Sequence, residues 1–262
     1  MPITHIPSLP STSDYLRHLA DSAATLEPYD AVRADFQTRG RGQVGNSWES
    51  EEGRNLLISV YARPQAVDVA RQFVVSMAVS IAVAETVAQL LPPDVRPQVK
   101  VKWPNDVYVA DRKICGILVE NRLAGRMIAD TIIGVGLNVN QEVFTSPAPN
   151  PVSIKNISGQ ENDIAQVADA LISALRLRLA LVDDCDDAEV LRLYWSLLYR
   201  ADGSYHNFAD AQGPFSAKIL SVMPDGHLVL LTQAGERRTY TFKEVEHVIA
   251  LPGGGSVTPN LE

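Results

Sequence analysis

Cysteine is scarce in this chain of 262 residues, and the two that occur, Cys115 and Cys185, stand in unrelated sequence contexts. No Cys-x-x-Cys pair is present, so the sequence predicts neither a zinc site nor a disulfide framework. The five histidines show no ligand spacing, and the Gly-x-Ser-x-Gly pattern of α/β-hydrolases is absent. These absences exclude metal hydrolases and serine hydrolases, predict no metal held by protein ligands, and are typical of a protein kept in a reducing cytoplasm.

Long hydrophobic runs and an excess of basic charge are missing as well. The first 30 residues contain no cationic start followed by an apolar stretch, and no run of about 18 apolar residues occurs. We therefore expect no signal peptide and no membrane contact. The net charge of -8 argues against general binding to nucleic acids. Against this acidic background, basic residues gather near two motifs: Arg39, Arg41, Arg54, Lys100, Lys102, Arg112 and Lys113.

The length allows one sizeable core and a small appendage. From apolar periodicity, helices are expected over residues 13–26, 68–91, 164–181 and 188–199. Strands are expected over 29–36, 56–62, 99–103, 107–110, 114–120 and 127–139, with a loop over 141–163. Short alternating runs beyond residue 203, separated by turns, predict a small β-barrel. The whole pattern predicts an α+β fold with a mixed, largely antiparallel sheet packed against helices.

A glycine-rich segment over residues 37–48 reads Gln-Thr-Arg-Gly-Arg-Gly-Gln-Val-Gly-Asn-Ser-Trp. Gly40, Gly42 and Gly45 satisfy the Gly-x-Gly-x-x-Gly pattern of dinucleotide-binding folds, which requires a helix directly after the glycines. Here another strand-like run follows, so that interpretation fails. We interpret the segment as a cationic loop that can close over a phosphate, with Arg41 offering the planar guanidinium that suits phosphate oxygens.

A second motif reads Lys-Trp-Pro-Asn-Asp over residues 102–106, and Lys-Ile-Cys-Gly follows over 113–116. Lys113 can stabilise charge as a phosphorus atom is attacked, and Gly116 lets a ligand approach the backbone closely. A solvated turn lysine is the alternative interpretation of Lys113. Asp106 can orient or deprotonate an amine, or it can be an ordinary turn aspartate.

Two further patterns complete the set: Ser11-Thr12-Ser13 before an amphipathic helix, and Gly134-x-Gly-x-Asn138 after a strand. In this order the four motifs resemble those of biotin protein ligases, over about residues 10 to 250. The run Lys-Trp-Pro-Asn-Asp followed by Arg-Lys-x-x-Gly-Ile-Leu-x-Glu carries most of the specificity. The resemblance implies the class II synthetase-like core shared by lipoate and biotin ligases, and a small C-terminal SH3-like β-barrel.

The resemblance also implies an activity and a domain order. We expect a catalytic domain over residues 1–202 that binds biotin and ATP, an SH3-like domain over 203–250 and a disordered tail over 251–262. Biotin, as substrate, would be adenylated with ATP and Mg²⁺ and passed to a lysine of a biotin carboxyl carrier protein domain of a biotin-dependent carboxylase. Homodimer formation is left open. Ten residues precede Ser11, so we expect no helix-turn-helix domain and no DNA binding.

By the same resemblance, catalytic roles fall to Lys113, Arg41 and Asp106, with Asp106 near the attacking lysine of the carrier. Residues expected to bind biotin or nucleotide are Ser11, Thr12, Gln37, Gly40, Arg41, Gly42, Trp48, Lys113, Gly116, Gly134 and Asn138. Trp48 would offer an aromatic face to adenine, and Asn138 would read the edge of the base.

The chain departs from the family pattern in its loop. Gln43 and Asn46 stand where arginine is common, and Arg39 where a small residue is common, so the tightness with which the loop encloses an adenylate is open. A lipoate ligase is the alternative enzyme, and a non-catalytic biotin-binding module is the alternative from another class. The intact Lys-Trp-Pro-Asn-Asp run and the C-terminal barrel favour biotin, and retention of Lys113 and Arg41 favours catalysis.

Overall fold

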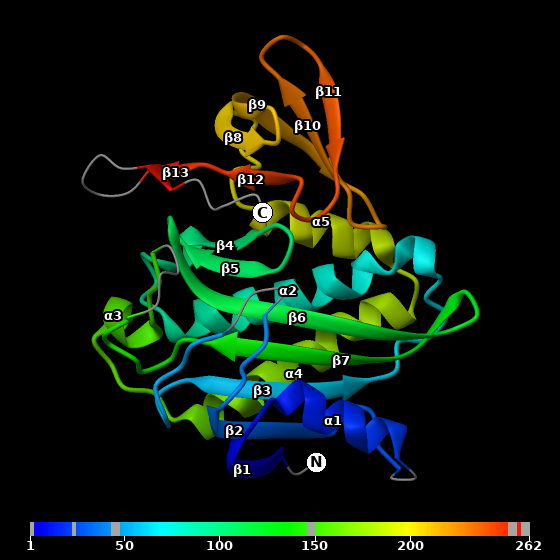
Figure 1. The fold of residues 1–262 in the computed structure, drawn as a ribbon, viewed down its shortest axis with the longest axis vertical. Helices are drawn as coiled ribbons and strands as arrows, with labels where there is room; N and C mark the ends of the chain where they lie inside the picture. The colour runs from blue at the N-terminus through cyan, green and yellow to red at the C-terminus, as the bar shows by residue number, and fades with distance from the viewer. Residues whose placement is uncertain (1–2, 23–24, 43–47, 146–149, 251–255, 258–262) are drawn as a thin grey trace.

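The computed structural model describes residues 3–22, 25–42, 48–145, 150–250 and 256–257. Its largest sheet has seven strands in the order β1-β2-β3-β7-β6-β5-β4 (Figure 1). In chain order these are β1 (Ile3–Leu9), β2 (Ala31–Gln37), β3 (Leu56–Ala62), β4 (Val99–Lys102), β5 (Asp106–Val109), β6 (Arg112–Ala124) and β7 (Met127–Leu137). β1 and β2 are parallel, and every other neighbouring pair is antiparallel. The predicted mixed, largely antiparallel sheet is confirmed.

One face of this sheet is covered by long helices. α2 (Phe73–Leu90) packs against α4 (Ile164–Asp183) and α5 (Asp187–Leu197), behind the sheet in the view of Figure 1. Apolar side chains surround α2 on all sides, which is why it lies at the centre of the core. With the preceding 3-10 helix η1 (Val69–Arg71), α2 is long and apolar enough to cross a membrane by composition alone, but 72% of the apolar window is buried inside the protein.

The opposite face carries the short helix α1 (Thr12–Asp21). Alternation along β3 distinguishes the two faces, because Ile58 belongs to the core under α2 whereas Tyr61 belongs to a smaller cluster with Leu16 of α1. Figure 1 shows β6 and β7 without a covering helix on this second face.

Residues 206–247 form a second sheet of five antiparallel strands in the order β11-β10-β9-β8-β12. These strands are β8 (His206–Asp210), β9 (Gly213–Val222), β10 (Leu228–Thr232), β11 (Arg237–Tyr240) and β12 (Val245–His247). Trp103 joins the two sheets, since its indole Nε1 donates to the Gly226 carbonyl at 3.0 Å and its ring packs against Phe242. The arrangement fits the predicted C-terminal barrel, and the α+β fold class is confirmed.

Neither β1 nor α3 (Ile154–Ser158) was expected from the sequence. β1 is an edge strand that contains Pro7, which interrupts the strand signal. α3 lies inside the predicted loop over 141–163, so that prediction is wrong at these residues. A capping box between Ser153 and Asn156 starts this helix, but five residues are too few to show a helical period.

Other boundaries shift by a few residues. The helix expected over 13–26 ends at Asp21, and the one expected over 68–91 begins as η1 before α2. A second 3-10 turn, η2 (Arg96–Gln98), leads into β4. Of the tail expected to be disordered, only Ser256–Val257 lie within the described residues, where they form β14 and pair with β13 (Ile249–Ala250).

Candidate active site

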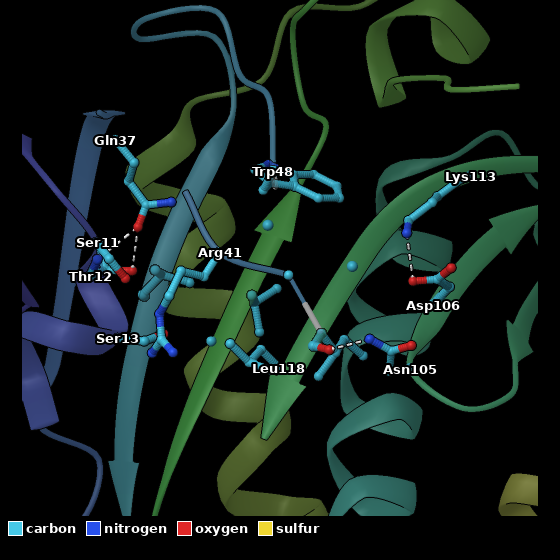
Figure 2. Close-up of a pocket in the computed structure, with 17 residues that line it drawn as sticks. Ser11, Thr12, Ser13, Gln37, Arg41, Trp48, Asn105, Asp106, Lys113 and Leu118 are labelled. Atoms are coloured by element: carbon cyan, nitrogen blue, oxygen red, sulfur yellow. Dashed lines mark hydrogen bonds and ion pairs between the residues drawn. The ribbon is translucent and has the colours of Figure 1, made fainter. Parts of the chain in front are cut away.

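A cleft lies on the open face of the large sheet, between the N-terminus of α1 and the β5–β6 hairpin (Figure 2). It encloses about 120 Å³. Its lining comprises Ser11, Thr12, Ser13, Gln37, Arg41, Gly42, Trp48, Ile58, Asn105, Asp106, Lys113, Gly116, Ile117, Leu118, Gly134, Val135 and Gly136. The fold therefore brings the four sequence motifs to one place, and every residue predicted for the site lines the cleft except Gly40 and Asn138.

A connected chain of polar side chains forms the α1 end of the cleft. Ser11 is the N-cap of α1, so the first turn of the helix faces the cavity. Gln37 Oε1 accepts from the Thr12 backbone N–H at 2.7 Å and from the Thr12 hydroxyl at 3.0 Å. Thr12 Oγ1 accepts from the Ser59 hydroxyl at 2.8 Å, and the hydroxyls of Ser59 and Ser13 are 2.9 Å apart. Three elements, α1, β2 and β3, thus share one hydrogen-bond chain.

Lys113 and Asp106 form the opposite end. Lys113 Nζ is 2.7 Å from Asp106 Oδ1, with 26% and 15% of the two side chains exposed. The Lys113 backbone is held on both sides, because its N–H donates to the Asn150 carbonyl and its carbonyl accepts from the Val152 N–H. Lys113 is the second residue of β6 and partly buried, so the interpretation as a solvated turn lysine is wrong.

Between these ends, the indole of Trp48 lies against two glycines. A Cβ atom at Gly136 would lie 2.5 Å from Trp48 Cε2, and one at Gly116 would lie 2.8 Å from Cζ3. Only glycine at both positions leaves room for the ring. The indole Nε1 is buried without a hydrogen-bond partner in the described part of the chain, and Lys113 Nζ lies 5.7 Å from the ring centre. Gly116 and Gly136 thus form a slot that the Trp48 ring fills.

Arg41 lies at the rim of the cleft and is paired with carboxylates. Its Nη2 is 2.8 Å from Asp14 Oδ1 and 2.8 Å from Glu120 Oε2, and 39% of its side chain is exposed. Asp14 belongs to α1 and Glu120 to β6, so the guanidinium bridges the two walls of the cleft. An anion that binds Arg41 must compete with both carboxylates.

Two predicted site residues lie outside the lining. Asn138 is buried beside the cleft, where its Nδ2 donates to the Val152 carbonyl at 3.1 Å. Its Oδ1 has no partner among the described residues, so the proposed contact with adenine stays a prediction. The Gly40 carbonyl accepts from the Trp48 N–H at 3.0 Å, and a Cβ at Gly40 would lie 2.5 Å from the Trp48 carbonyl oxygen. Gly40 therefore shapes the loop instead of lining the cavity.

The loop residues Gln43, Gly45 and Asn46 lie outside the described residues, so nothing here bears on their predicted effects. Sequence reasoning also missed four participants: Asp14, Ser59, Glu120 and Gly136. Sequence signals for three of them were present. Ser59 is a polar residue within the otherwise apolar strand Leu56–Ala62, and Gly136 is the second glycine of the Gly-x-Gly pattern. Glu120 is the glutamate that ends the motif Arg-Lys-x-x-Gly-Ile-Leu-x-Glu. Asp14 had no local signal, and the pairing of both carboxylates with Arg41 could not be predicted because they lie far from it in the chain.

Burial shifts the pKa values of two titratable groups near the cleft. Desolvation lowers the pKa of Lys102, and the nearby Asp106 carboxylate partly opposes this shift. Desolvation raises the pKa of the Cys115 thiol, which is fully buried. Cys115 therefore stays protonated and unreactive, and packing is its role. No cluster of three or more histidine, cysteine, aspartate or glutamate residues suited to a metal occurs in the described ranges.

Comparisons with a family model and with known proteins indicate the same family. Residues 5–138 match the model of the biotin/lipoate A/B protein ligase family. The chain is 30% identical to the bifunctional ligase/repressor BirA of Bacillus spizizenii over 80% of its own length and 64% of that protein. It is 32% identical to the biotin--[acetyl-CoA-carboxylase] ligase of Mycobacterium tuberculosis over 64% of this chain and 60% of that one. The chain thus spans less than two thirds of the length of these relatives.

A solved structure supports the fold independently. The biotin protein ligase of Aquifex aeolicus in complex with biotin and ATP superposes with a TM-score of 0.71 at 22% identity, covering 94% of this chain and 98% of that one. At this identity the likeness establishes the fold.

Proposed function

The chain belongs to the biotin/lipoate A/B protein ligase family, and we propose that it adenylates biotin with ATP and transfers the biotinyl group to a lysine of a biotin carboxyl carrier protein. The acceptor would be a domain of a biotin-dependent carboxylase, and the reaction would take place in the cytoplasm. Residues 1–202 would form the catalytic domain and 203–250 the SH3-like domain.

One observation carries the choice of biotin within the family: the polar chain at the α1 end of the cleft. The head group of biotin is a cyclic urea, which has a carbonyl that accepts and N–H groups that donate hydrogen bonds. The dithiolane ring of lipoate has neither. Buried groups that stay unpaired cost about 1 to 3 kcal/mol each, so a cleft rich in hydroxyl and amide groups disfavours lipoate. Ser11, Thr12, Ser13 and Gln37 make this end polar.

The first step would join the biotin carboxylate to the α-phosphorus of ATP. A carboxylate oxygen attacks phosphorus, the bond to the bridging oxygen of the β-phosphate breaks, and pyrophosphate leaves. Lys113 lies at the end of the cleft opposite the hydroxyl and amide groups of the α1 end, where its ammonium could stabilise the charge that gathers on phosphate oxygens. Arg41 at the rim would leave its two carboxylates and bind the phosphate.

The second step would transfer the acyl group to the carrier. The carrier amine attacks the carbonyl carbon of the mixed anhydride, the amide forms, and AMP leaves. An ammonium must first lose a proton, and Asp106, within 2.7 Å of Lys113, is the carboxylate of the cleft lining that can accept it. Trp48, whose ring lies on the two glycines, would offer its other face to adenine.

Mg²⁺ would come with ATP. A magnesium ion bound through phosphates needs only one or two protein carboxylates, and Asp106 is the carboxylate that lines the cleft. This fits the lack of a larger acidic cluster within the described residues. The ion would neutralise triphosphate charge.

The test is pyrophosphate release by the purified chain with ATP, Mg²⁺ and either biotin or lipoate, followed by mass spectrometry of an added carrier domain. We expect release with biotin and a mass increase of one biotinyl group on the carrier. Pyrophosphate release with lipoate but not with biotin would assign the lipoate-ligase alternative. Tight biotin binding without release would assign the non-catalytic binding module.

A further inference from the structure

We infer that Ser59, which lies beneath the cleft and outside its lining, completes the hydrogen-bond pattern of the cleft, because it occupies one lone pair of the Thr12 hydroxyl and commits the proton of the Ser13 hydroxyl. Ser59 would thereby be a positioning residue for the urea of the ligand. This role rests on the proposed function and concerns the α1 end of the cleft. Ser59 is in the middle of β3, opposite Gly134 of β7, and is fully buried.

The directions of the hydrogen bonds in this network can be assigned from a group that can only donate. The backbone N–H of Thr12 lies 2.7 Å from the Gln37 side chain, so the amide atom there must be the oxygen, Oε1. The Thr12 hydroxyl lies 3.0 Å from the same oxygen and must also donate to it. The Gln37 Nε2 group then points away from Thr12, toward the middle of the cleft in Figure 2.

The remaining protons follow from this start. A hydroxyl has one proton, and Thr12 gives its proton to Gln37. The bond of 2.8 Å between Thr12 and Ser59 must therefore be donated by Ser59. Since Ser59 has then used its proton, the bond of 2.9 Å between Ser13 and Ser59 must be donated by Ser13. The hydroxyl protons of Thr12, Ser59 and Ser13 are therefore each donated to a protein oxygen.

The cleft consequently presents a set pattern of partners. Gln37 Nε2, which has no hydrogen-bond partner in the described part of the chain, offers N–H donors. The Thr12 oxygen keeps one lone pair and the Ser13 oxygen keeps two, so toward a ligand both can only accept. A cyclic urea needs this combination, because its carbonyl must receive hydrogen bonds and its N–H groups must give them. Ser13 also faces Gly134, where a Cβ atom would lie 2.7 Å from its Oγ.

Removal of the Ser59 hydroxyl would release this constraint. Ser13 would lose the oxygen to which it donates, and its free proton could turn toward the N–H of the ligand. Thr12 would lose the donor that occupies one of its lone pairs. The cleft would keep its shape and every residue that touches the ligand, but the pattern of donors and acceptors would no longer be unique.

The experiment compares Ser59→Ala with a matched loss of a buried hydroxyl elsewhere. Ser80 of α2 is 1% exposed, donates to the Ser76 carbonyl and lies outside the cleft, so Ser80→Ala is the control. In Ser59→Ala we expect the KM for biotin to rise by about tenfold to a hundredfold, with kcat and the KM for ATP within about twofold of wild type. Desthiobiotin, which keeps the urea and lacks the sulfur, should suffer the same loss.

A second variant distinguishes loss of the hydroxyl from misfolding. Ser59→Cys keeps the shape with a weak donor and should fall between wild type and Ser59→Ala in its KM for biotin. Thermal unfolding of all variants separates stability from binding. Three results would each overturn the inference. The KM for biotin could be equal in Ser59→Ala and Ser80→Ala, Ser59→Ala could lower kcat alone, or its rise in KM for biotin could be absent with desthiobiotin. An inactive wild-type chain would instead refute the proposed function, and direct calorimetry of biotin binding to both variants would then decide the role of Ser59.

Discussion

Lys113 and Asp106 face each other across the β5–β6 hairpin, with Nζ 2.7 Å from Oδ1. The pair places a cation suited to phosphate beside a carboxylate suited to an amine. If Lys113 turned to a phosphate oxygen in the proposed reaction, Asp106 would lose its partner and could accept a proton. The two steps of the proposed reaction would thus be coupled through one ion pair.

Lys113→Ala should slow formation of biotinyl-adenylate by at least about tenfold, because one preorganised donor typically contributes about 3 kcal/mol to the transition state. Lys113→Arg should rescue only in part, since a guanidinium places its donors differently. Single-turnover pyrophosphate release measures the step, and Lys218→Ala, in the second sheet, is the matched control. An unchanged rate would transfer the role to Arg41 or Lys102.

Gly134→Ala and Gly136→Ala should damage different parts of the cleft: the α1 end and the middle, where Trp48 lies. A Cβ at Gly134 would lie 2.7 Å from Ser13 Oγ, and one at Gly136 would lie 2.5 Å from the Trp48 ring. We expect the first change to raise mainly the KM for biotin and the second mainly the KM for ATP. Steady-state kinetics with each substrate varied in turn measures both. Identical effects of the two substitutions would contradict the separation of a urea end from a ring slot.

Trp48→Ala should weaken ATP binding more than biotin binding, since stacking of a base on an aromatic ring contributes about 1 to 3 kcal/mol. The affinities can be measured by calorimetry with each ligand. Trp195→Ala, a change of a partly exposed tryptophan on α5, is the control. A tighter complex with ATP would show that Trp48 only blocks the slot it occupies in this structure.

Glu120→Gln and Asp14→Asn should release Arg41 without much change in stability. Exposed ion pairs contribute about 0 to 1 kcal/mol, and 39% of the Arg41 side chain is exposed. Because the carboxylates compete with phosphate for Arg41, the double variant should have a lower KM for ATP. High salt should reduce the difference from wild type. A higher KM in the double variant would instead show that the carboxylates help to bind the nucleotide.

His247 should make the fold sensitive to acid. Burial, aided by the positive charges of Lys102 and Arg200, holds the pKa of His247 well below its usual value of 6.5. The unfolded chain therefore binds a proton below about pH 6.5 that the folded protein does not bind. The free energy of unfolding should fall by up to about 1.4 kcal/mol per pH unit from this residue as the pH drops below 6.5, and not above it.

Urea unfolding at pH 7.5 and pH 5.5 would measure this contribution. The comparison is with His247→Phe, which keeps a ring between Tyr199 and Phe208. Wild type should lose more stability than the variant between the two pH values. Equal losses would mean that other groups cause the acid sensitivity.

Local patterns along the chain determined much of this protein. β3 was predicted at its observed bounds, Leu56–Ala62, because seven consecutive residues suited to strands are bounded by polar ones. Ser11 was among the predicted caps because a hydroxyl before an amphipathic run satisfies backbone N–H groups. The motif around Lys113 indicated the family. Each of these signals lies within a few adjacent residues.

Tertiary structure alone decided the contacts between distant segments. The pairing of Arg41 with Asp14 and Glu120, the position of Trp48 on Gly116 and Gly136, and the place of Ser59 in the hydrogen-bond chain depend on how strands far apart in sequence align. α3 was missed because its signals span too few residues to form a period. Periodicity and capping are local properties of a chain, whereas the direction of a hydrogen bond between α1, β2 and β3 exists only once packing has brought all three together.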